Sequence, residues 1–221
     1  MSMRKLNVIL IIAILVCFVG TAVMLLLLPD QVPVHMNFSG EVDRLGSKFE
    51  YLIFPAIAAG AGVFFLLMSK TEEKKGPESN ANILMWCGIA VVAVFTVLGF
   101  IFMMKARNYD PDAAKLTYDD GSKFTGIAIG ALLVVLGNIM PKARMNSMFG
   151  IRTSWSLASD SVWQKTQRVG GFSSVICGFV MVILSLFIPG SWSGPMILIL
   201  VLIMAGVGVW ASRHYYLEEM R

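Results

Sequence analysis

Side chains that could bind a metal or a ligand are confined to a few short segments of this 221-residue chain. The segment 28–48, LPDQVPVHMNFSGEVDRLGSK, places His35 close in sequence to Asn37 and Asp43. His35 and Asp43 could share a cation, but a metal site needs three or four convergent ligands. We therefore expect no metal and no cofactor. We expect these three side chains to shape the segment by bonding backbone groups that its prolines leave free.

Long apolar runs separate the polar segments and must position them. Six runs contain no Asp, Glu, Lys, Arg or His, and each is about as long as a bilayer-crossing helix requires, roughly 17 to 25 residues. The chain is 57% hydrophobic and 14% charged, whereas soluble domains carry about a quarter charged residues. We predict an all-α, polytopic membrane protein whose six transmembrane helices cover residues 6–28, 51–68, 83–104, 124–140, 169–188 and 195–211.

We treat the chain as one membrane domain divided in sequence order. The first part, 1–68, is a helix pair with an ordered extracellular loop at 29–50. The second part, 69–140, holds the third and fourth helices, and the third part, 141–221, holds an amphipathic loop and the last helix pair. Small residues spaced by four in several spans predict close helix packing. This packing could lie within one chain or across a homodimer.

The distribution of Lys and Arg predicts the orientation. The face that carries both termini holds twelve of these residues and the opposite face holds six, and basic residues favour the cytoplasmic side. Both termini should therefore be cytoplasmic in a cell membrane, with the loop 29–50 outside. That loop has a net charge of −2, which suits a cationic ligand.

The loop between the fourth and fifth spans is the longest and the richest in polar residues. Pro141 should end the fourth span, Asn146 and Gly150 are typical turn residues, and Ser159 is a suitable N-cap for a short helix over 160–168. Its tryptophans are expected at headgroup depth. We expect this basic, aromatic loop to bind anionic lipid headgroups or to dock a cytoplasmic partner. The residues we assign to docking are Asn138, Asn146, Gly150, Arg152, Thr153, Trp155, Trp163 and Arg168.

The two loops together resemble the SdpI family of bacterial membrane proteins. The outer loop is similar to the family signature P-x-x-x-P-x-H-x-N-x-x-G-x-x-D-x-x-x-x-K, and the inner loop to G-N-x-M-x-K-x-x-x-N-x-x-x-G-I-R-T-x-W. The chain departs from the family at Ser154, where proline is common, and at Gln167, where histidine is common. The matching residues are Pro29, Pro33, His35, Asn37, Gly40, Asp43 and Lys48 outside, and Gly137, Asn138, Met140, Asn146, Gly150, Ile151, Arg152, Thr153, Trp155 and Trp163 inside.

The resemblance implies an immunity protein. Such a protein protects its cell from a secreted toxin peptide, and it also acts as a receptor that draws a cytoplasmic transcriptional repressor to the membrane. We expect no direct contact with nucleic acid. We expect the toxin peptide to be received outside by Pro33, His35, Asn37, Gly40, Asp43 and Lys48.

Two other functions remain as alternatives. Transporters of small solutes or peptides usually carry ionisable residues inside their spans, which this chain lacks, although unwound backbone at glycines could substitute. An intramembrane hydrolase needs groups that can meet, but His35 and His214 are predicted on opposite sides of the bilayer. No H-E-x-x-H or G-x-S-x-G motif is present. We therefore expect a binding protein and not an enzyme.

Overall fold

The computed structural model describes residues 2–36, 42–76, 79–109, 118–146 and 148–221. Within these residues the chain forms six long helices, one β-hairpin and three short 3₁₀ turns. The helices are α1 (Met3–Leu27), α2 (Ile53–Glu73), α3 (Ala81–Arg107), α4 (Tyr118–Ile139), α5 (Asp160–Phe187) and α6 (Ser193–Glu219). The strands are β1 (Gln31–Met36) and β2 (Val42–Ser47), and the turns are η1 (Lys48–Leu52), η2 (Met140–Lys142) and η3 (Gly190–Trp192).

The six predicted spans are confirmed, because each coincides with a helix long and apolar enough to cross a membrane. The backbone explains why only helices are used. A bilayer offers no water to backbone N–H and C=O groups, and a helix satisfies them within its own segment. One expectation is corrected: the short helix predicted over 160–168 is not separate, since α5 runs without a break from Asp160 to Phe187.

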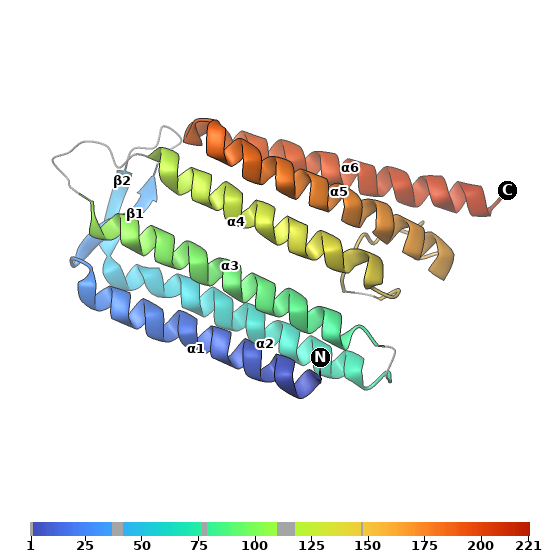
Figure 1. The fold of residues 1–221 in the computed structure, drawn as a ribbon, viewed down its shortest axis with the longest axis horizontal. Coiled ribbons are helices and arrows are strands. Elements are labelled where there is room, and N and C mark those ends of the chain that lie inside the picture. The colour runs from blue at the N-terminus through green and yellow to red at the C-terminus, as the bar shows by residue number, and fades with distance from the viewer. Residues whose placement is uncertain (1, 37–41, 77–78, 110–117, 147) are drawn as a thin grey trace.

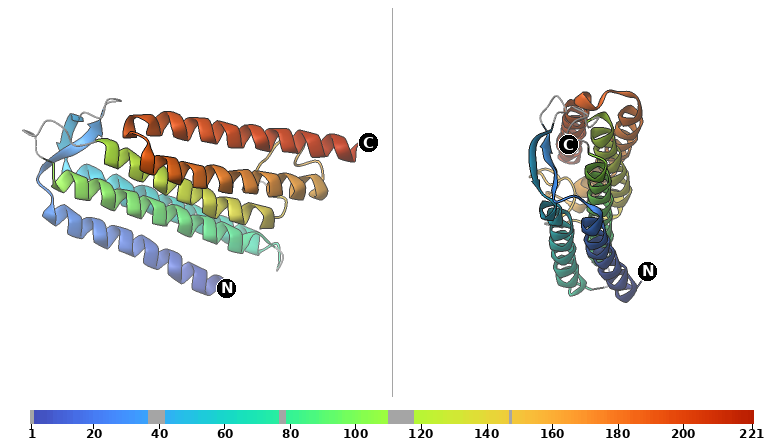
Figure 2. Two further views of the ribbon diagram at one scale, coloured as in Figure 1. Left: turned by 45° about the horizontal axis from the view of Figure 1, so that its top comes forward. Right: turned by 90° about the vertical axis from the view of Figure 1, so that its left-hand side faces the viewer.

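The helices pack as two groups of three, α1–α3 and α4–α6, which meet where α3 contacts α4 (Figure 1). The hairpin stands at one end of the bundle, and both chain termini lie toward the other (Figures 1 and 2). We call these the hairpin end and the terminal end.

Glycines bring α4 and α5 into close contact, as the small-residue spacing predicted. A Cβ at Gly130 would lie 2.7 Å from the carbonyl oxygen of Gly178, and a Cβ at Gly178 would lie 2.6 Å from that of Gly130. Gly137 and Gly171 oppose each other in the same way. The hydroxyl of Ser174 also donates a 2.9 Å hydrogen bond to a carbonyl oxygen of α4. In lipid, where helices gain little from apolar burial, such close approach supplies the packing energy.

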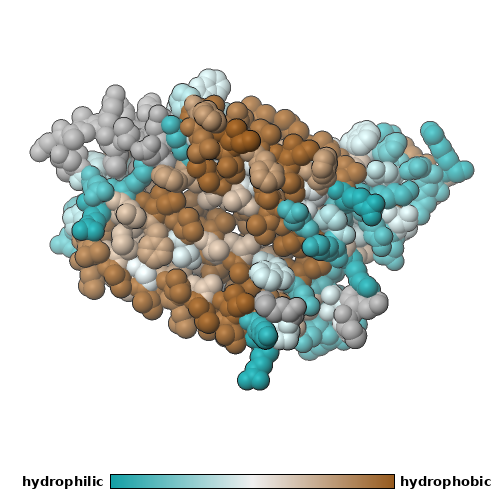
Figure 3. Space-filling view, viewed as in Figure 1, coloured by the Kyte–Doolittle hydropathy of each residue, from teal (hydrophilic) through white to brown (hydrophobic). Residues whose placement is uncertain are grey.

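The outward surface of the bundle suits a membrane. Figure 3 shows an apolar band over the middle of one face, with hydrophilic residues toward the terminal end. Large apolar side chains point outward at many positions; Leu26 is 84% exposed and Phe187 is 78% exposed. In water such a surface would cause association, whereas in a bilayer it faces lipid.

The packing of α4 on α5 can be tested with Gly130→Ala. The added methyl would meet the backbone of α5, so we expect the free energy of unfolding to fall by about 1–3 kcal/mol. Thermal unfolding of the purified protein in detergent measures this change. The control is Gly60→Ala in α2, where an added Cβ meets nothing within 4 Å. Equal stability of the two variants would show that the contact between α4 and α5 is not close.

Candidate functional site

The described parts of the outer loop, 29–36 and 42–50, contain the two strands of a hairpin, which we did not predict. β1 and β2 pair antiparallel, with Gln31 opposite Ser47 and Pro33 opposite Leu45. The register shifts on both sides of His35, and such irregularities re-aim side chains in a strand. The available signal was the alternation V-P-V-H-M before a Ser-Gly turn, which the prolines obscured.

Buried contacts fix the hairpin on the helices. Val32 has no exposed surface and packs with Tyr51 in a cluster formed by the ends of α1 and α3. The Tyr51 hydroxyl donates a buried 2.7 Å hydrogen bond to the carbonyl oxygen of Pro33. Lys48 forms a 2.9 Å ion pair with Asp30, across the base of the hairpin. A buried carbonyl left without its donor would cost about 1–3 kcal/mol, so Tyr51 holds the strand in place.

Two close side-chain pairs involve the hairpin: one joins its two strands, and the other joins β2 to η1. His35 Nδ1 is 2.6 Å from Asp43 Oδ1, and an Arg44 nitrogen is 2.9 Å from a Glu50 carboxylate oxygen. All four side chains are at least 40% exposed, and exposed pairs contribute only about 0–1 kcal/mol. Their role is orientation. Gly46 leaves room for this arrangement, because a Cβ there would collide with the Glu50 carboxylate.

The structure modifies our expectation for this loop. We predicted that His35 and Asp43 bond to backbone groups, but among the described residues these side chains bond to each other. The backbone carbonyl is satisfied by Tyr51 instead, a residue we did not single out. Asn37 and Gly40, which we assigned to ligand binding, lie outside the described residues.

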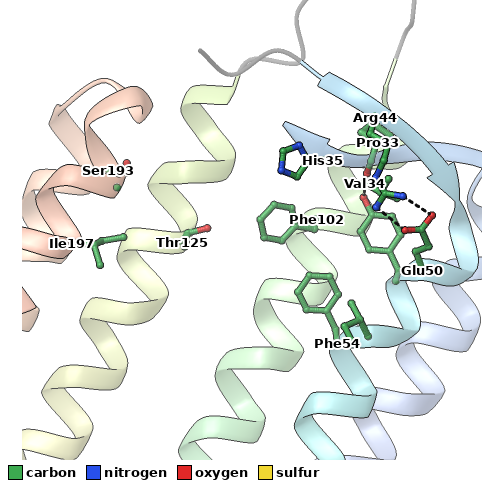
Figure 4. A pocket seen from close by; sticks show the side chains of 13 residues that line it. Pro33, Val34, His35, Arg44, Glu50, Phe54, Phe102, Thr125, Ser193 and Ile197 are labelled. Atoms are coloured by element: carbon green, nitrogen blue, oxygen red, sulfur yellow. Dashed lines mark hydrogen bonds and ion pairs between the residues drawn. The ribbon is translucent and has the colours of Figure 1, made fainter. Parts of the chain in front are cut away.

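A cavity of about 710 Å³ lies beneath the hairpin, between the two groups of helices (Figure 4). One wall is aromatic: the Tyr51 and Phe54 rings stack at 6.1 Å, and the Phe54 and Phe102 rings at 5.8 Å. Ligand pockets of about 300–1,000 Å³ with mainly apolar walls and a few polar groups are common. The facing wall, from α4 and α6, is formed by Thr125, Ser193, Gly194 and Ile197, and Pro33, Val34, His35, Arg44, Glu50 and Ile53 complete the lining.

The cavity joins some predicted residues to others that sequence analysis missed. Pro33 and His35 line it, whereas Asp43 and Lys48 do not. The aromatic wall and the residues of α4 and α6 were not predicted. They come from four separate helices, and no short-range pattern in the sequence reports such an arrangement.

At the terminal end, the loop from Lys142 to Ser159, which we call the 142–159 loop, is held by turns of the predicted kind. The Asn146 side-chain oxygen accepts hydrogen bonds from the backbone N–H groups of Met148 and Phe149, at 2.8 and 2.7 Å. Gly150 has φ +102°, a conformation that other residues rarely adopt. The roles of Asn146 and Gly150 as turn residues are confirmed.

Gln167 binds this loop from α5. Its side chain is fully buried, accepts a hydrogen bond from Ile151 N–H at 2.9 Å and donates one to Ile151 C=O at 2.9 Å. The Ile151 side chain lies against Gly170 of α5 and Gly208 of α6, and a Cβ at Gly208 would be 2.6 Å from its Cδ1. Ile151 therefore fills the space between two helices that glycines leave open.

Further buried polar groups connect the loop to its surroundings. Thr153 and Ser156 bond each other, and the Thr153 hydroxyl donates to Ser212 of α6 at 3.0 Å. The Asn80 side chain accepts from Arg144 N–H and donates to Arg144 C=O, at 2.9 and 3.0 Å. Each of these bonds satisfies a backbone or hydroxyl group that would otherwise be costly to bury, so the loop is fixed to both helix groups.

The structure corrects the position of Trp163. We predicted it at headgroup depth and on a docking surface, but it is fully buried. Its indole N–H donates a 2.8 Å hydrogen bond to Ala143 C=O, which lets the whole ring be enclosed. Trp163 therefore supports the loop from inside.

The remaining predicted docking residues differ in exposure. Arg152 and Arg168 are exposed, whereas Trp155 is half-buried. Asn138 is exposed, but its side chain donates to Val134 C=O in its own helix. The capping role predicted for Ser159 is confirmed, since its hydroxyl accepts from Val162 N–H at 3.2 Å.

The described part of the chain holds no group of three or more His, Cys, Asp or Glu side chains that could bind a metal ion. His35 and Asp43 form a pair without a third such ligand there. At the hairpin end the described residues provide a shaped surface and hydrogen-bonding groups for a ligand.

Comparison with known proteins covers both ends of the molecule. Residues 142–212 match the SdpI/YfhL protein family, and residues 11–59 match a domain of unknown function (DUF1648). The chain is 24% identical over 213 residues to the immunity protein SdpI of Bacillus subtilis (strain 168), covering 96% of each chain. It is 44% identical over 43 residues to an uncharacterized protein of Archaeoglobus fulgidus, or 20% of this chain and 24% of that one.

No solved structure matches the chain. The two matched segments contain the features described above: residues 11–59 include the hairpin, and 142–212 include the 142–159 loop. With six helices of membrane-spanning length and similarity to SdpI along almost its whole length, the chain is a multi-pass protein of the cell membrane.

The role of Gln167 can be tested with Gln167→Ala. Loss of its two hydrogen bonds leaves buried backbone groups of Ile151 poorly satisfied, at a cost of about 1–3 kcal/mol. We expect the Ile151 amide to exchange with solvent about 10 to 100 times faster in a hydrogen-exchange measurement. Gln164→Ala, an exposed position on the same helix, is the control. Unchanged exchange in Gln167→Ala would mean that the loop is held by other contacts.

Proposed function

We propose that this chain, which belongs to the SdpI/YfhL protein family, is a membrane immunity protein that protects its cell from a secreted toxin peptide. The observation that carries the proposal is its similarity to the immunity protein SdpI, which extends over 96% of both chains. Agreement over this length includes both loops and all six spans, so it concerns the whole molecule and not one motif.

The hairpin end supports the capture of a ligand. The hairpin is fixed on the helices, carries oriented polar groups and covers a cavity with an aromatic wall. A peptide arriving from outside meets this end first if the basic terminal end is cytoplasmic, as the positive-inside rule favours. Binding there would sequester the toxin before it disturbs the membrane.

The terminal end supports a second role, in which the protein draws a cytoplasmic repressor to the membrane. The backbone of the 142–159 loop is fixed from inside by Gln167 and Trp163, while Arg152 and Arg168 stay exposed. A rigid backbone that presents charged side chains loses little entropy on docking. The same cations can also contact anionic lipid headgroups.

The helices α4–α6 supply a physical connection between the ends. α4 and α6 both line the cavity through Thr125 and Ser193, and α5 and α6 hold Ile151 of the 142–159 loop between them. A change in the spacing of these helices at one end would alter their spacing at the other end. The reason is that close glycine contacts resist local deformation and transmit strain along the helices. Signalling across the membrane would use this connection.

Protection should depend on the His35–Asp43 pair. We expect His35→Ala and Asp43→Ala each to lower the lethal dose of toxin for an expressing host by about tenfold. The reason is that each substitution removes a charge-assisted contact. The assay is survival of a sensitive host against candidate secreted peptides, with membrane levels measured by immunoblot. Glu73→Ala, an exposed acid at the terminal end, should leave survival unchanged. Full protection in both hairpin variants would place capture elsewhere.

Signalling should depend on the other end. Arg152→Ala or Trp155→Ala should leave survival intact and abolish the toxin-dependent response of a reporter driven by the gene's own promoter. If the two sets of variants lose survival and reporter response together, the proposed division between the ends is wrong.

A further inference from the structure

We propose that the cavity beneath the hairpin is the peptide-binding site, and that it takes up an apolar segment of the peptide with one backbone carbonyl bonded to Ser193. The inference rests on the proposed function only for the source of that peptide. The site itself is argued from the lining of the cavity and from one unsatisfied polar group.

The two walls of the cavity favour apolar side chains. The stacked rings of Tyr51, Phe54 and Phe102 form one wall, and Ile197 faces them from α6 (Figure 4). Tyr51 cannot turn away, because its hydroxyl is bonded to the hairpin. Aromatic rings held in this way lose little entropy when they pack against an aromatic or branched aliphatic group of a ligand.

Ser193 is a polar group without a partner in this lining. It is 2% exposed, and its hydroxyl oxygen has no hydrogen-bond partner among the described residues. A buried hydroxyl in this state is destabilising. Ser193 lines the cavity, so a χ1 rotation that brings its hydroxyl to the cavity surface would let it donate to a carbonyl oxygen of a ligand.

An acceptor for Ser193 among apolar groups favours a peptide over a hydrocarbon chain. The hydrocarbon part of a phospholipid would fill the apolar space but carries no acceptor, because its ester carbonyls lie at the headgroup end. A peptide offers a backbone carbonyl beside each apolar side chain. The paired Arg44 and Glu50 on the hairpin side of the cavity can bond the polar groups that follow the apolar segment.

Filling the cavity tests its use. Gly194 lines it, and an added Cβ there meets nothing within 4 Å, so Gly194→Phe adds a ring at the cavity wall without displacing backbone. The probe is a dansylated, C-terminally amidated Leu-Phe-Leu tripeptide, titrated against the full chain in lipid nanodiscs. We expect at least a tenfold loss of affinity, since a phenyl ring occupies the space that the probe's own side chains need.

The matched control is Gly206→Phe. Gly206 lies twelve residues further along the same helix, about 18 Å away, and an added Cβ there also meets nothing within 4 Å. This variant should bind the tripeptide like the unmodified chain. Equal binding by Gly194→Phe and Gly206→Phe would overturn the assignment of the cavity.

Removing the hydroxyl tests the class of ligand. Ser193→Ala should lower the affinity for the tripeptide by about three- to tenfold, which is the effect of losing one hydrogen bond. Dansyl-dodecylamine has an apolar chain but no peptide carbonyl, so Ser193→Ala should bind it with unchanged affinity. If Gly194→Phe blocks both probes while Ser193→Ala weakens neither, the cavity holds an acyl chain and the proposal is wrong.

Failure of this inference can be told apart from failure of the proposed function. If Gly194→Phe loses the tripeptide but still protects its host fully, the toxin binds elsewhere and the inference fails while the immunity function stands. If the tripeptide binds as described but expressing cells resist no secreted peptide, the cavity assignment stands and the immunity function fails.

Discussion

The absence of Asp, Glu, Lys, Arg and His from the six apolar runs of the sequence is the constraint on which the rest of this structure depends. The interior of a bilayer supplies no hydrogen-bond partners, so the chain crosses it only as helices with satisfied backbones. Charged side chains are therefore gathered toward the two ends of the bundle, where the hairpin and the 142–159 loop lie.

Backbone groups without helical hydrogen bonds are satisfied in the same way at both ends of the bundle. A non-helical segment lying on a helix bundle leaves backbone groups without partners, and a buried side chain supplies what is missing. Tyr51 does this for Pro33 at the hairpin end. Gln167 does it for Ile151 at the terminal end. In each loop this backbone bond is buried or partly buried, whereas most charged side chains around it lie at the surface.

Sequence analysis predicted the spans because length and composition determine them almost alone. It also predicted the Ser159 cap, the turn at Asn146 and Gly150, and close helix packing through small residues, although not that α4 packs on α5. Each of these depends on residues near one another in the chain or on a repeated spacing. The geometry of a helix or a turn then converts the spacing into position.

What could not be predicted depends on contacts between distant segments. The cavity needs side chains from α2, α3, α4 and α6, and burial of Trp163 needs a carbonyl twenty residues away, at Ala143. Proline in β1 obscured the hairpin, although a proline is tolerated at the edge of a two-stranded sheet. Gln167 was noted only as a departure from the pattern of the family that the loops resemble, at a position where histidine is common. Its importance lies in bonding a backbone N–H and C=O at once.

Cysteine accessibility tests the central claim, an uncharged and dry membrane interior between two recognition ends. The native Cys17, Cys87 and Cys177 are all buried within the spans. A membrane-impermeant maleimide should label none of them, in intact cells or in inside-out vesicles. Gln31→Cys should be labelled in intact cells, and Ser154→Cys only in inside-out vesicles. Labelling of a native cysteine, or the reverse pattern for the two variants, would contradict the account.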